Sequence, residues 1–246
     1  MKILVFGTTG QVGRELIARS GDVQLESLGR DTADFEDPAA CAAHVAATDA
    51  DAIIIAAAYT AVDKAEEDEP RATQVNAETP GAIARAAAAR GMPVVHISTD
   101  YVFDGSGDVA FAPDDAVNPL GAYGRTKLAG EVEVRDAGGP HAILRTSWVF
   151  SPHGNNFVKT MLRLGAERDA LTIVADQIGG PTAAGHIADA CLLIAQHLVD
   201  DPAKSGTYHF SGGPDVSWAD FARAIFARAG MMCRVDDIPS SQYPTP

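Results

Sequence analysis

Short strand-like runs, most of them rich in apolar residues, recur along the chain, and helical stretches separate them. The runs cover residues 2–6, 23–28, 51–56, 93–98 and 142–150, and the main helical stretches cover residues 14–19, 70–90 and 121–134. Runs that are apolar throughout are typical of strands buried on both faces of a parallel sheet. The alternation therefore predicts an α/β fold, a doubly wound parallel sheet of the Rossmann type with ligands at the carboxyl ends of its strands.

After residue 150 the pattern becomes less regular. A helical stretch at 157–167 and a strand at 171–175 precede an amphipathic helix at 187–199, a strand at 206–211 and a helix at 217–229. No repeat or low-complexity linker separates the two parts. We therefore predict a first domain over residues 1–150 and a smaller, interleaved α/β lobe over residues 151–246, with helix 187–199 packed back on the first domain.

Charge and composition argue against several partners. A formal net charge of −14 disfavours nucleic acid, whose phosphates require a basic face, and an anionic membrane surface. Apolar runs such as residues 52–59 are too short to cross a bilayer. An anionic nucleotide stays open as a ligand, because helix ends and a few local cations can outweigh distant acids.

Cysteine and histidine usage bears on location and metals. Cys41, Cys191 and Cys233 lie far apart without a Cys-x-x-Cys motif, which indicates reduced thiols and a cytoplasmic location. The first apolar run starts at residue 2, so no signal peptide is expected before it. The seven histidines are also scattered, so we predict no structural or catalytic metal.

Three glycines follow the first apolar run at regular spacing. Gly7 permits a tight turn, Gly10 lets the backbone approach a pyrophosphate, and Gly13 lets the next helix pack close to the strand. The amino end of that helix offers N–H groups to phosphates. Small residues at 56–58, after the third strand, would let the chain pass close to a ribose, although alanine also simply favours helix. These features predict a dinucleotide site.

The end of the second strand bears on the choice of nicotinamide cofactor. Enzymes that use NAD usually place an acid there for the ribose 2′-hydroxyl, but Glu26 lies inside the strand and Asp31 lies beyond it. Arg30 could instead accept a 2′-phosphate, and a solvated loop arginine is an equal interpretation. The sequence therefore favours NADPH and leaves NADH open as an accepted alternative.

A second group of candidates consists of a threonine, a tyrosine and a lysine. Tyr123 and Lys127 are four residues apart, so their side chains share one helix face. A phenol has a pKa near 10, and an ammonium beside it favours the phenolate; lowering the pKa by roughly three units takes about 4 kcal/mol. Such a tyrosine could give a proton to a carbonyl oxygen while a hydride reaches the carbon. Thr99 could bond both the carbonyl and the Tyr123 hydroxyl, and capping a turn is its alternative role.

These motifs resemble those of the extended short-chain dehydrogenases/reductases. The matching segments are Gly-x-x-Gly-x-x-Gly at 7–13, Ser-Thr-Asp-Tyr-Val-Phe-x-Gly at 98–105 and Tyr-Gly-x-Thr-Lys-x-x-Gly-Glu at 123–131. Segments at 56–66, 145–150, 154–161, 176–182 and 243–246 extend the match over nearly the whole chain. The resemblance implies an NAD(P)H-dependent oxidoreductase that reduces the C4 keto group of dTDP-4-dehydro-L-rhamnose, giving dTDP-L-rhamnose. The first domain would bind the cofactor and the second lobe the substrate.

The resemblance also implies roles for the matching residues. Tyr123 would protonate the C4 oxygen, Lys127 would hold the ribose hydroxyls, and Thr99 would orient the carbonyl. The substrate would contact Thr99, Asp100, Tyr123, Trp148 and Asn156. The cofactor would contact Gly7, Gly10, Gln11, Val12, Gly13, Arg30, Asp34, Phe35, Ala57, Ala58, Tyr59, Tyr123 and Lys127. For Asp34, Phe35 and Trp148 an ordinary structural role fits the sequence equally well.

The family pattern leaves other points open. Family members continue past the segment that ends in Tyr-Pro-Thr-Pro, so we expect the second lobe to be incomplete at its carboxyl end, and a homodimer stays open. A sugar-nucleotide 4-epimerase or 4,6-dehydratase is an alternative, although Tyr101 replaces the glutamate that dehydratases use. These enzymes regenerate their NAD, whereas a reductase consumes NADPH. A non-catalytic subunit similar to the regulatory subunit of methionine adenosyltransferase would show no turnover.

Overall fold

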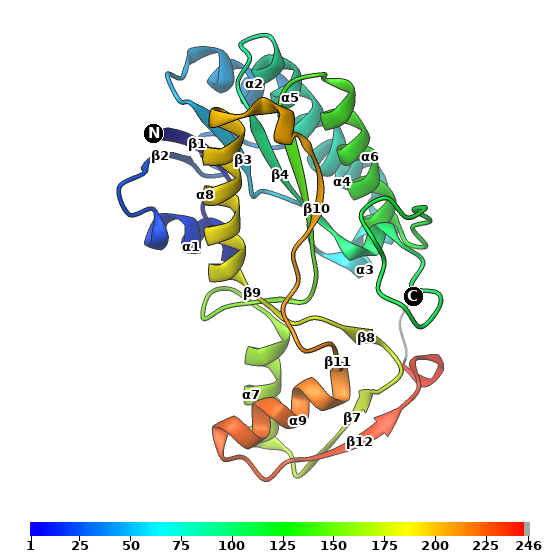
Figure 1. The fold of residues 1–246 in the computed structure, drawn as a ribbon. Helices are drawn as coiled ribbons and strands as arrows, with labels where there is room; N and C mark the ends of the chain where they lie inside the picture. Colours follow the sequence, from blue (N-terminus) through cyan, green and yellow to red (C-terminus); the bar gives the residue numbers. More distant parts are fainter. Residues whose placement is uncertain (244–246) are drawn as a thin grey trace. The chain divides into compact units, whose positions relative to one another are not determined.

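The computed structural model describes residues 1–243 (Figure 1). Within these residues, one parallel sheet has six strands in the order β10-β5-β4-β3-β1-β2. The strands are β1 (Lys2–Phe6), β2 (Gln24–Leu28), β3 (Ala52–Ile55), β4 (Val94–Thr99), β5 (His141–Thr146) and β10 (Gly206–His209). The central strands β1 and β3 are buried almost throughout, which explains their uniformly apolar sequences. The predicted doubly wound parallel sheet is confirmed.

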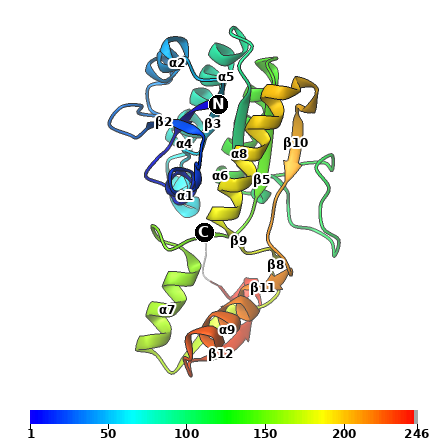
Figure 2. The ribbon, with the colours of Figure 1, turned by 60° about the vertical axis from the view of Figure 1, so that its left-hand side comes forward.

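Helices cover both faces of this sheet (Figures 1 and 2). On one face, α2 (Pro38–Ala47), α5 (Thr79–Ala88) and α6 (Ala122–Asp136) pack side by side. On the other face, α1 (Gln11–Arg19) lies near α8 (Ala184–Asp200), and Arg19 bonds to Asp189 across the two helices at 2.8 Å. Between β3 and α5 the chain forms α3 (Val62–Glu67), α4 (Glu69–Thr73) and a π-helical turn (Gln74–Glu78).

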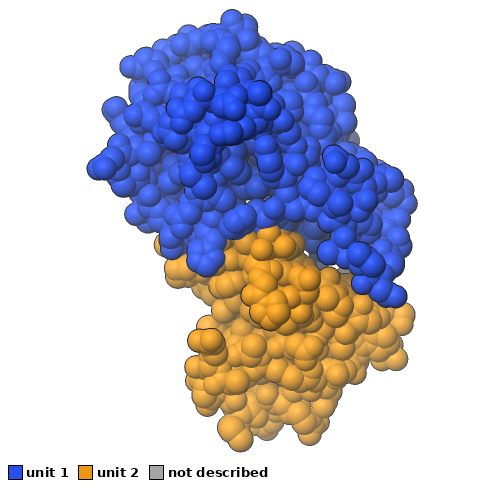
Figure 3. Space-filling model, viewed as in Figure 1, with its two compact units in different colours: residues 1–146, 185–210 blue, residues 147–184, 211–246 orange. Residues whose placement is uncertain are grey.

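The described chain divides into two compact units (Figure 3). Unit 1 comprises Met1–Thr146 and Gly185–Phe210, and unit 2 comprises Ser147–Ala184 and the chain from Ser211 onward. Unit 2 contains α7 (Phe157–Glu167), α9 (Trp218–Ala229) and the parallel pair β7 (Ala170–Val174) and β12 (Arg234–Ile238). Its short strands are β6 (Val149–Phe150), β8 (Ile178–Gly179), β9 (Thr182–Ala183) and β11 (Val216–Ser217). A separate core around Met161, Leu171 and Phe226 stabilises it.

The structure differs from the sequence interpretation at two places. Residues 142–150 do not form one strand, because β5 ends at Thr146 and Trp148 adopts a φ of 45°, which turns the chain before β6. The strand expected at 206–211 belongs to unit 1, because β10 pairs in register with β5. The first segment of unit 1 therefore ends at Thr146, not at residue 150 as predicted. The helix α8 lies in unit 1, the domain on which helix 187–199 was expected to pack.

The helix α6 packs unusually close to its neighbours because it carries glycine at two contact points. An added Cβ at Gly130 would clash with the backbone oxygen of Asn76 in the π-helical turn. An added Cβ at Gly124 would clash with the backbone oxygen of Tyr101. These two glycines therefore set the depth at which α6 sits.

We predict that Gly130→Ala destabilises the protein although alanine is the better helix former. The alanine gains about 1 kcal/mol of helix propensity, but the clash with rigid backbone forces α6 outward. Overpacking of this kind typically costs about 1–3 kcal/mol, so urea denaturation should show a lower free energy of unfolding. Val132→Ala, at an exposed position of the same helix, is the control. Stability of Gly130→Ala equal to the native value would contradict the close packing.

Candidate active site

The turn between β1 and α1 has the geometry that its glycines predict. Gly7 has a φ of 99°, and an added Cβ there would clash with the backbone of Ala57. An added Cβ at Gly13 would clash with the carbonyl of Gly7, whereas one at Gly10 would meet only that oxygen, at 3.8 Å. Gly7 and Gly13 are therefore required by packing. Gly10 caps the amino end of α1, where backbone N–H groups can bind a phosphate.

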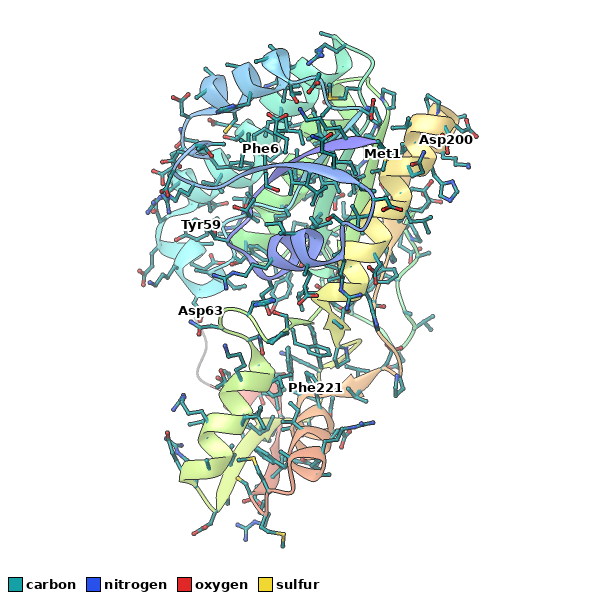
Figure 4. The ribbon with its side chains drawn as sticks, turned by 90° about the vertical axis from the view of Figure 1, so that its left-hand side faces the viewer. Met1, Phe6, Tyr59, Asp63, Asp200 and Phe221 are labelled. Atoms are coloured by element: carbon teal, nitrogen blue, oxygen red, sulfur yellow. The ribbon has the colours of Figure 1, made fainter. Side chains whose placement is uncertain are left out.

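The segment after β3 lies against this turn and continues toward α6. Asn76, in the π-helical turn, fixes it: its side-chain oxygen accepts from the Tyr59 N–H at 2.8 Å, and its amide donates to the Tyr59 carbonyl at 3.2 Å. The same amide donates to the Thr126 hydroxyl in α6 at 3.1 Å. Figure 4 shows Tyr59 and Asp63 where the chain leaves the sheet after β3. Asn76 was not predicted from sequence, since a single asparagine in a helical stretch carries no pattern.

The end of β2 presents an arginine rather than an acid. The carboxylate of Glu26 bonds to Lys2 at 2.7 Å and accepts from the Thr48 hydroxyl at 2.8 Å, so it is already engaged within the domain. Arg30 is well exposed and donates to Glu36 at 2.6 Å. The same oxygen of Glu36 accepts from Arg71 of α4 at 2.5 Å. Two guanidinium groups therefore converge beyond this strand end.

Asp34 and Phe35 have clear structural roles in the same loop. The Phe35 ring is buried in the core and meets Phe6 edge-on at 5.7 Å between centroids. The Asp34 carboxylate accepts from the backbone N–H of Glu36 at 3.1 Å. Asp34 and Phe35 therefore both have the ordinary structural role that the sequence allowed as an alternative to cofactor binding.

Thr99 and Tyr123 are brought together at the carboxyl end of β4. Thr99 is the last residue of the strand, and its hydroxyl donates to Asp100 at 3.1 Å and accepts from the Tyr101 N–H at 3.2 Å. The Thr99 side chain also acts on the Tyr123 phenol, where it works to lower the pKa. The Tyr123 ring meets Tyr101 edge-on at 5.5 Å and shares an alanine-rich cluster with Tyr59. The glycine turn between β1 and α1, the segment at 57–59 and Tyr123 therefore form one continuous region.

Burial dominates the electrostatics of this region. It raises the pKa of the Tyr123 phenol above its ordinary value, and the influence of the neighbouring Thr99 side chain opposes that change. Burial also raises the pKa of Asp100 to about 6, again opposed by the bond with Thr99. Tyr123 therefore stays a neutral, proton-carrying phenol at neutral pH.

Lys127 is buried and faces β4. Its ammonium donates to the Ile97 carbonyl at 2.8 Å and lies 3.2 Å from Nε2 of His96. Burial lowers the pKa of Lys127 to about 8, and the charge of Glu131 opposes that change. The prediction that the ammonium lowers the pKa of the phenol is therefore wrong for this arrangement, because burial of Tyr123 outweighs other effects and the ammonium bonds to β4.

A buried ion pair lies one helical turn beyond Lys127. Glu131 is fully buried and accepts from Arg145 of β5 at 2.9 and 2.7 Å, from Ser98 at 2.6 Å and from Arg135 at 2.7 Å. Burial alone would raise the pKa of Glu131, but these donors hold it below its ordinary value. Arg145 also donates to the Pro113 carbonyl at 3.1 Å, so the pair fixes the long loop before α6 as well.

Trp148 and Asn156 belong to unit 2. The Trp148 ring stacks on Trp218 with 3.5 Å between centroids, and an added Cβ at Gly179 would lie 2.7 Å from it. Asn156 caps α7 by accepting from the Lys159 N–H at 3.1 Å, and its amide donates to the Ser151 carbonyl at 2.8 Å. Trp218 was not predicted, since an aromatic residue at a helix start reads equally well as core.

Metal sites and membrane-spanning helices are both absent from the described residues. Across residues 1–243, no three His, Cys, Asp or Glu side chains are grouped so that they could hold a metal ion. In the same range, no helix has both the length and the apolar character to cross a membrane.

Comparison with known proteins identifies the family. The family model described as RmlD substrate binding domain matches residues 1–246. The dTDP-4-dehydrorhamnose reductase of Sinorhizobium fredii (strain NBRC 101917 / NGR234) is 43% identical over 253 residues, which cover 100% of this chain and 86% of that protein. The crystal structure of a dTDP-4-dehydrorhamnose reductase from Clostridium acetobutylicum ATCC 824 superposes with a TM-score of 0.92 at 37% identity, covering 100% of this chain and 86% of that one. The enzyme of the same name from Bacillus anthracis str. Ames, in complex with NADP, gives a TM-score of 0.92 at 33% identity, with 99% and 86% covered.

The parallel sheet and the glycine turn, together with the reductases that match the whole chain, define a Rossmann-type reductase related to the short-chain dehydrogenases/reductases. The chain belongs to the family of the dTDP-4-dehydrorhamnose reductases. The family predicted from the sequence motifs is confirmed.

The buried ion pair predicts a pH-dependent stability. Glu131→Gln leaves Arg145 without its counter-charge and should lower the free energy of unfolding at pH 7 by about 3–5 kcal/mol. Because the pKa of Glu131 is lowered in the folded protein, its contribution is complete above the unfolded value of about 4.3 and is lost as the pH falls through the folded pKa. The difference between native protein and variant should therefore shrink in acid.

Urea denaturation between pH 7 and pH 3 measures this difference. Glu133→Gln is the matched control, because Glu133 lies on the same helix but pairs with Arg85 at the surface. Its substitution should change stability by less than about 1 kcal/mol. A difference for Glu131→Gln that stays constant across the pH range would contradict a charged Glu131.

Proposed function

We propose that this protein reduces the C4 keto group of dTDP-4-dehydro-L-rhamnose, consuming NADPH and giving dTDP-L-rhamnose. The observation that carries the proposal is the placement of Thr99, at the end of β4, beside the buried phenol of Tyr123, with Lys127 one helical turn further along α6. Relatives that bear the name dTDP-4-dehydrorhamnose reductase match the whole chain and support the choice of substrate.

The residues present fit the nicotinamide cofactor, which supplies the hydride when bound. Gly10 leaves open space at the amino end of α1, where Gln11 and Val12 follow, so a pyrophosphate can approach the backbone. We assign Arg30, Asp34 and Phe35 to the adenosine side of the cofactor. We assign Ala57, Ala58, Tyr59 and Lys127 to its ribose side, with the turn glycines Gly7 and Gly13 shaping the site.

Tyr123 carries the proton in this proposal. Its raised pKa keeps the phenol protonated at neutral pH, which is the form that an acid requires. As negative charge develops on the C4 oxygen, the phenol gives up its proton to that oxygen. Once the phenol has lost its proton, the Thr99 hydroxyl, which donates to Asp100 in the structure, would donate to the phenolate instead and favour it. Thr99 thus has a second role beyond capping the turn.

Within unit 1 we assign Thr99, Asp100 and Tyr123 as substrate contacts. Within unit 2, taken by itself, the candidates for substrate contacts are Trp148 and Asn156. We propose that the Trp148 ring stacks on the substrate, because its left-handed backbone and its contact with Trp218 hold the ring in one orientation. The case for a substrate contact is weaker for Asn156, because its side chain already caps α7.

Location and assembly are further parts of the proposal. Cys41 and Cys191 are buried free thiols, and burial raises the pKa of Cys41 to about 11. Unreactive thiols of this kind support a reducing compartment such as the cytoplasm. A homodimer is the assembly that we propose to test, by light scattering of the purified protein.

The Tyr123→Phe variant tests the proton donor. Loss of the phenolic hydroxyl should lower kcat by roughly 10²–10⁴-fold, measured as NADPH oxidation with dTDP-4-dehydro-L-rhamnose. Tyr208→Phe, which removes an exposed hydroxyl bonded to the Lys204 carbonyl, should retain native turnover. Full turnover of Tyr123→Phe would show that another group donates the proton. Substrate conversion without net NADPH consumption would indicate an epimerase or dehydratase instead.

The Arg30→Ala variant tests cofactor recognition. If the guanidinium binds the 2′-phosphate, KM for NADPH should rise by roughly tenfold or more, the loss expected for a hydrogen bond to a charged group. KM for NADH, which lacks that phosphate, should stay within about twofold. Arg163→Ala is the control, because Arg163 pairs with Glu167 on the surface of unit 2. An equal rise for both cofactors would exclude 2′-phosphate recognition.

A further inference from the structure

His96 is an exception among the residues of the central sheet. It lies in β4 between Ile55 of β3 and Ile143 of β5, and it is fully buried. Such a position normally holds an apolar residue, because a buried polar group costs free energy unless it is hydrogen-bonded. Among the described residues, its Nδ1 has no hydrogen-bond partner, while its Nε2 lies 3.2 Å from the Lys127 ammonium. The contact with Lys127 is therefore the feature that explains a histidine here.

The contact is part of a repeating match between β4 and α6. Residues two apart in a strand share a face and are about 6.6 Å apart, and residues four apart in a helix are about 6 Å apart. His96 meets Lys127, and Ser98 meets Glu131, so two polar pairs join the strand to the helix at matching intervals. We infer that His96 is a positioning residue, which accepts a hydrogen bond from the Lys127 ammonium and thereby directs that group for the reaction proposed above.

The charge state of the imidazole suits this role. Burial lowers the pKa of His96 well below its ordinary value, and the positive charges of Lys127 and Arg135 lower it further, so the ring is neutral. The other charged groups on this face are Glu131 of α6 and Arg145 of β5, which pair with each other. A neutral ring that accepts at Nε2 carries its proton on Nδ1. His96 thus offers a lone pair without adding a charge.

This arrangement fixes the direction of the ammonium. Lys127 has three N–H donors, and within the described structure the Ile97 carbonyl and His96 take two of them. The remaining N–H must then point away from β4. A ribose hydroxyl of the cofactor would take that third donor, so the two β4 acceptors would set the orientation of the lysine before the cofactor binds.

The test compares His96→Leu, which removes the acceptor, with His96→Gln, whose side-chain oxygen can reach the position of Nε2. NADPH affinity is measured by fluorescence titration, and kcat and kcat/KM by NADPH oxidation from pH 6 to pH 10. His96→Leu should bind NADPH roughly tenfold more weakly, the loss expected for one hydrogen bond to a charged group. The alkaline limb of its kcat/KM profile should move about one unit lower, because the ammonium loses an acceptor. His96→Gln should restore both properties, and His141→Leu, in the partly exposed first residue of β5, should resemble the native protein.

Far-ultraviolet circular dichroism and thermal melting establish that each variant is folded. Equal NADPH affinity and equal pH profiles for His96→Leu and His96→Gln would overturn the inference, because only packing would then matter. If His96→Leu does not fold, His96→Asn replaces it, since its shorter side chain cannot reach the ammonium. Equal NADPH affinity and equal pH profiles for His96→Asn and His96→Gln would then overturn the inference. If native protein fails to reduce the 4-keto sugar nucleotide while these variants differ in NADPH affinity, the proposed reaction fails and the role of His96 stands.

Discussion

The close packing of α6 against β4 is the constraint on which the site depends. Gly124 and Gly130 remove the side chains that would hold the helix away from its neighbours. At this depth the polar groups of the helix lie in the protein interior, where each needs a partner, and the strand supplies them at matching intervals. The pair Glu131–Arg145 then joins α6 to β5 and to the loop at Pro113. The geometry of the candidate site and the stability of the domain therefore both depend on how closely α6 packs against its neighbours.

The sequence predicted the sheet, and it placed the candidate residues Tyr123 and Lys127 on one helix, because both inferences follow from local spacing. Uniformly apolar runs identify buried strands, and the interval between Tyr123 and Lys127 is one helical turn. His96, Asn76 and Trp218 could not be predicted in this way, because each acts through a residue distant in sequence. The end of β5 was also missed, since nothing in an apolar run shows that one of its residues adopts a left-handed backbone.

The electrostatics show a similar limit of sequence reasoning. A lysine one turn from a tyrosine lowers the pKa of the phenol only if both groups stay solvated. Solvation is needed because the ammonium and the phenolate must then be charged at the same time. In the folded protein, burial raises the pKa of Tyr123 and lowers the pKa of Lys127, which favours the neutral form of each group. Spacing placed Tyr123 and Lys127 on one helix, as the structure has them, but only the three-dimensional environment shows which protonation state each one holds. For a proton donor, the neutral phenol is the useful state.

The passage of the chain between the units has a consequence for synthesis on the ribosome. The strand β10 completes the sheet of unit 1 beside β5, but it is translated only after Ser147–Ala184, which belongs to unit 2. Until then, β5 forms an edge strand with unpaired backbone groups, the kind of edge that can pair with another chain. The nascent protein therefore depends on a late segment to close an early domain. Gene fragments that separate the two halves by a single cut would leave that edge exposed.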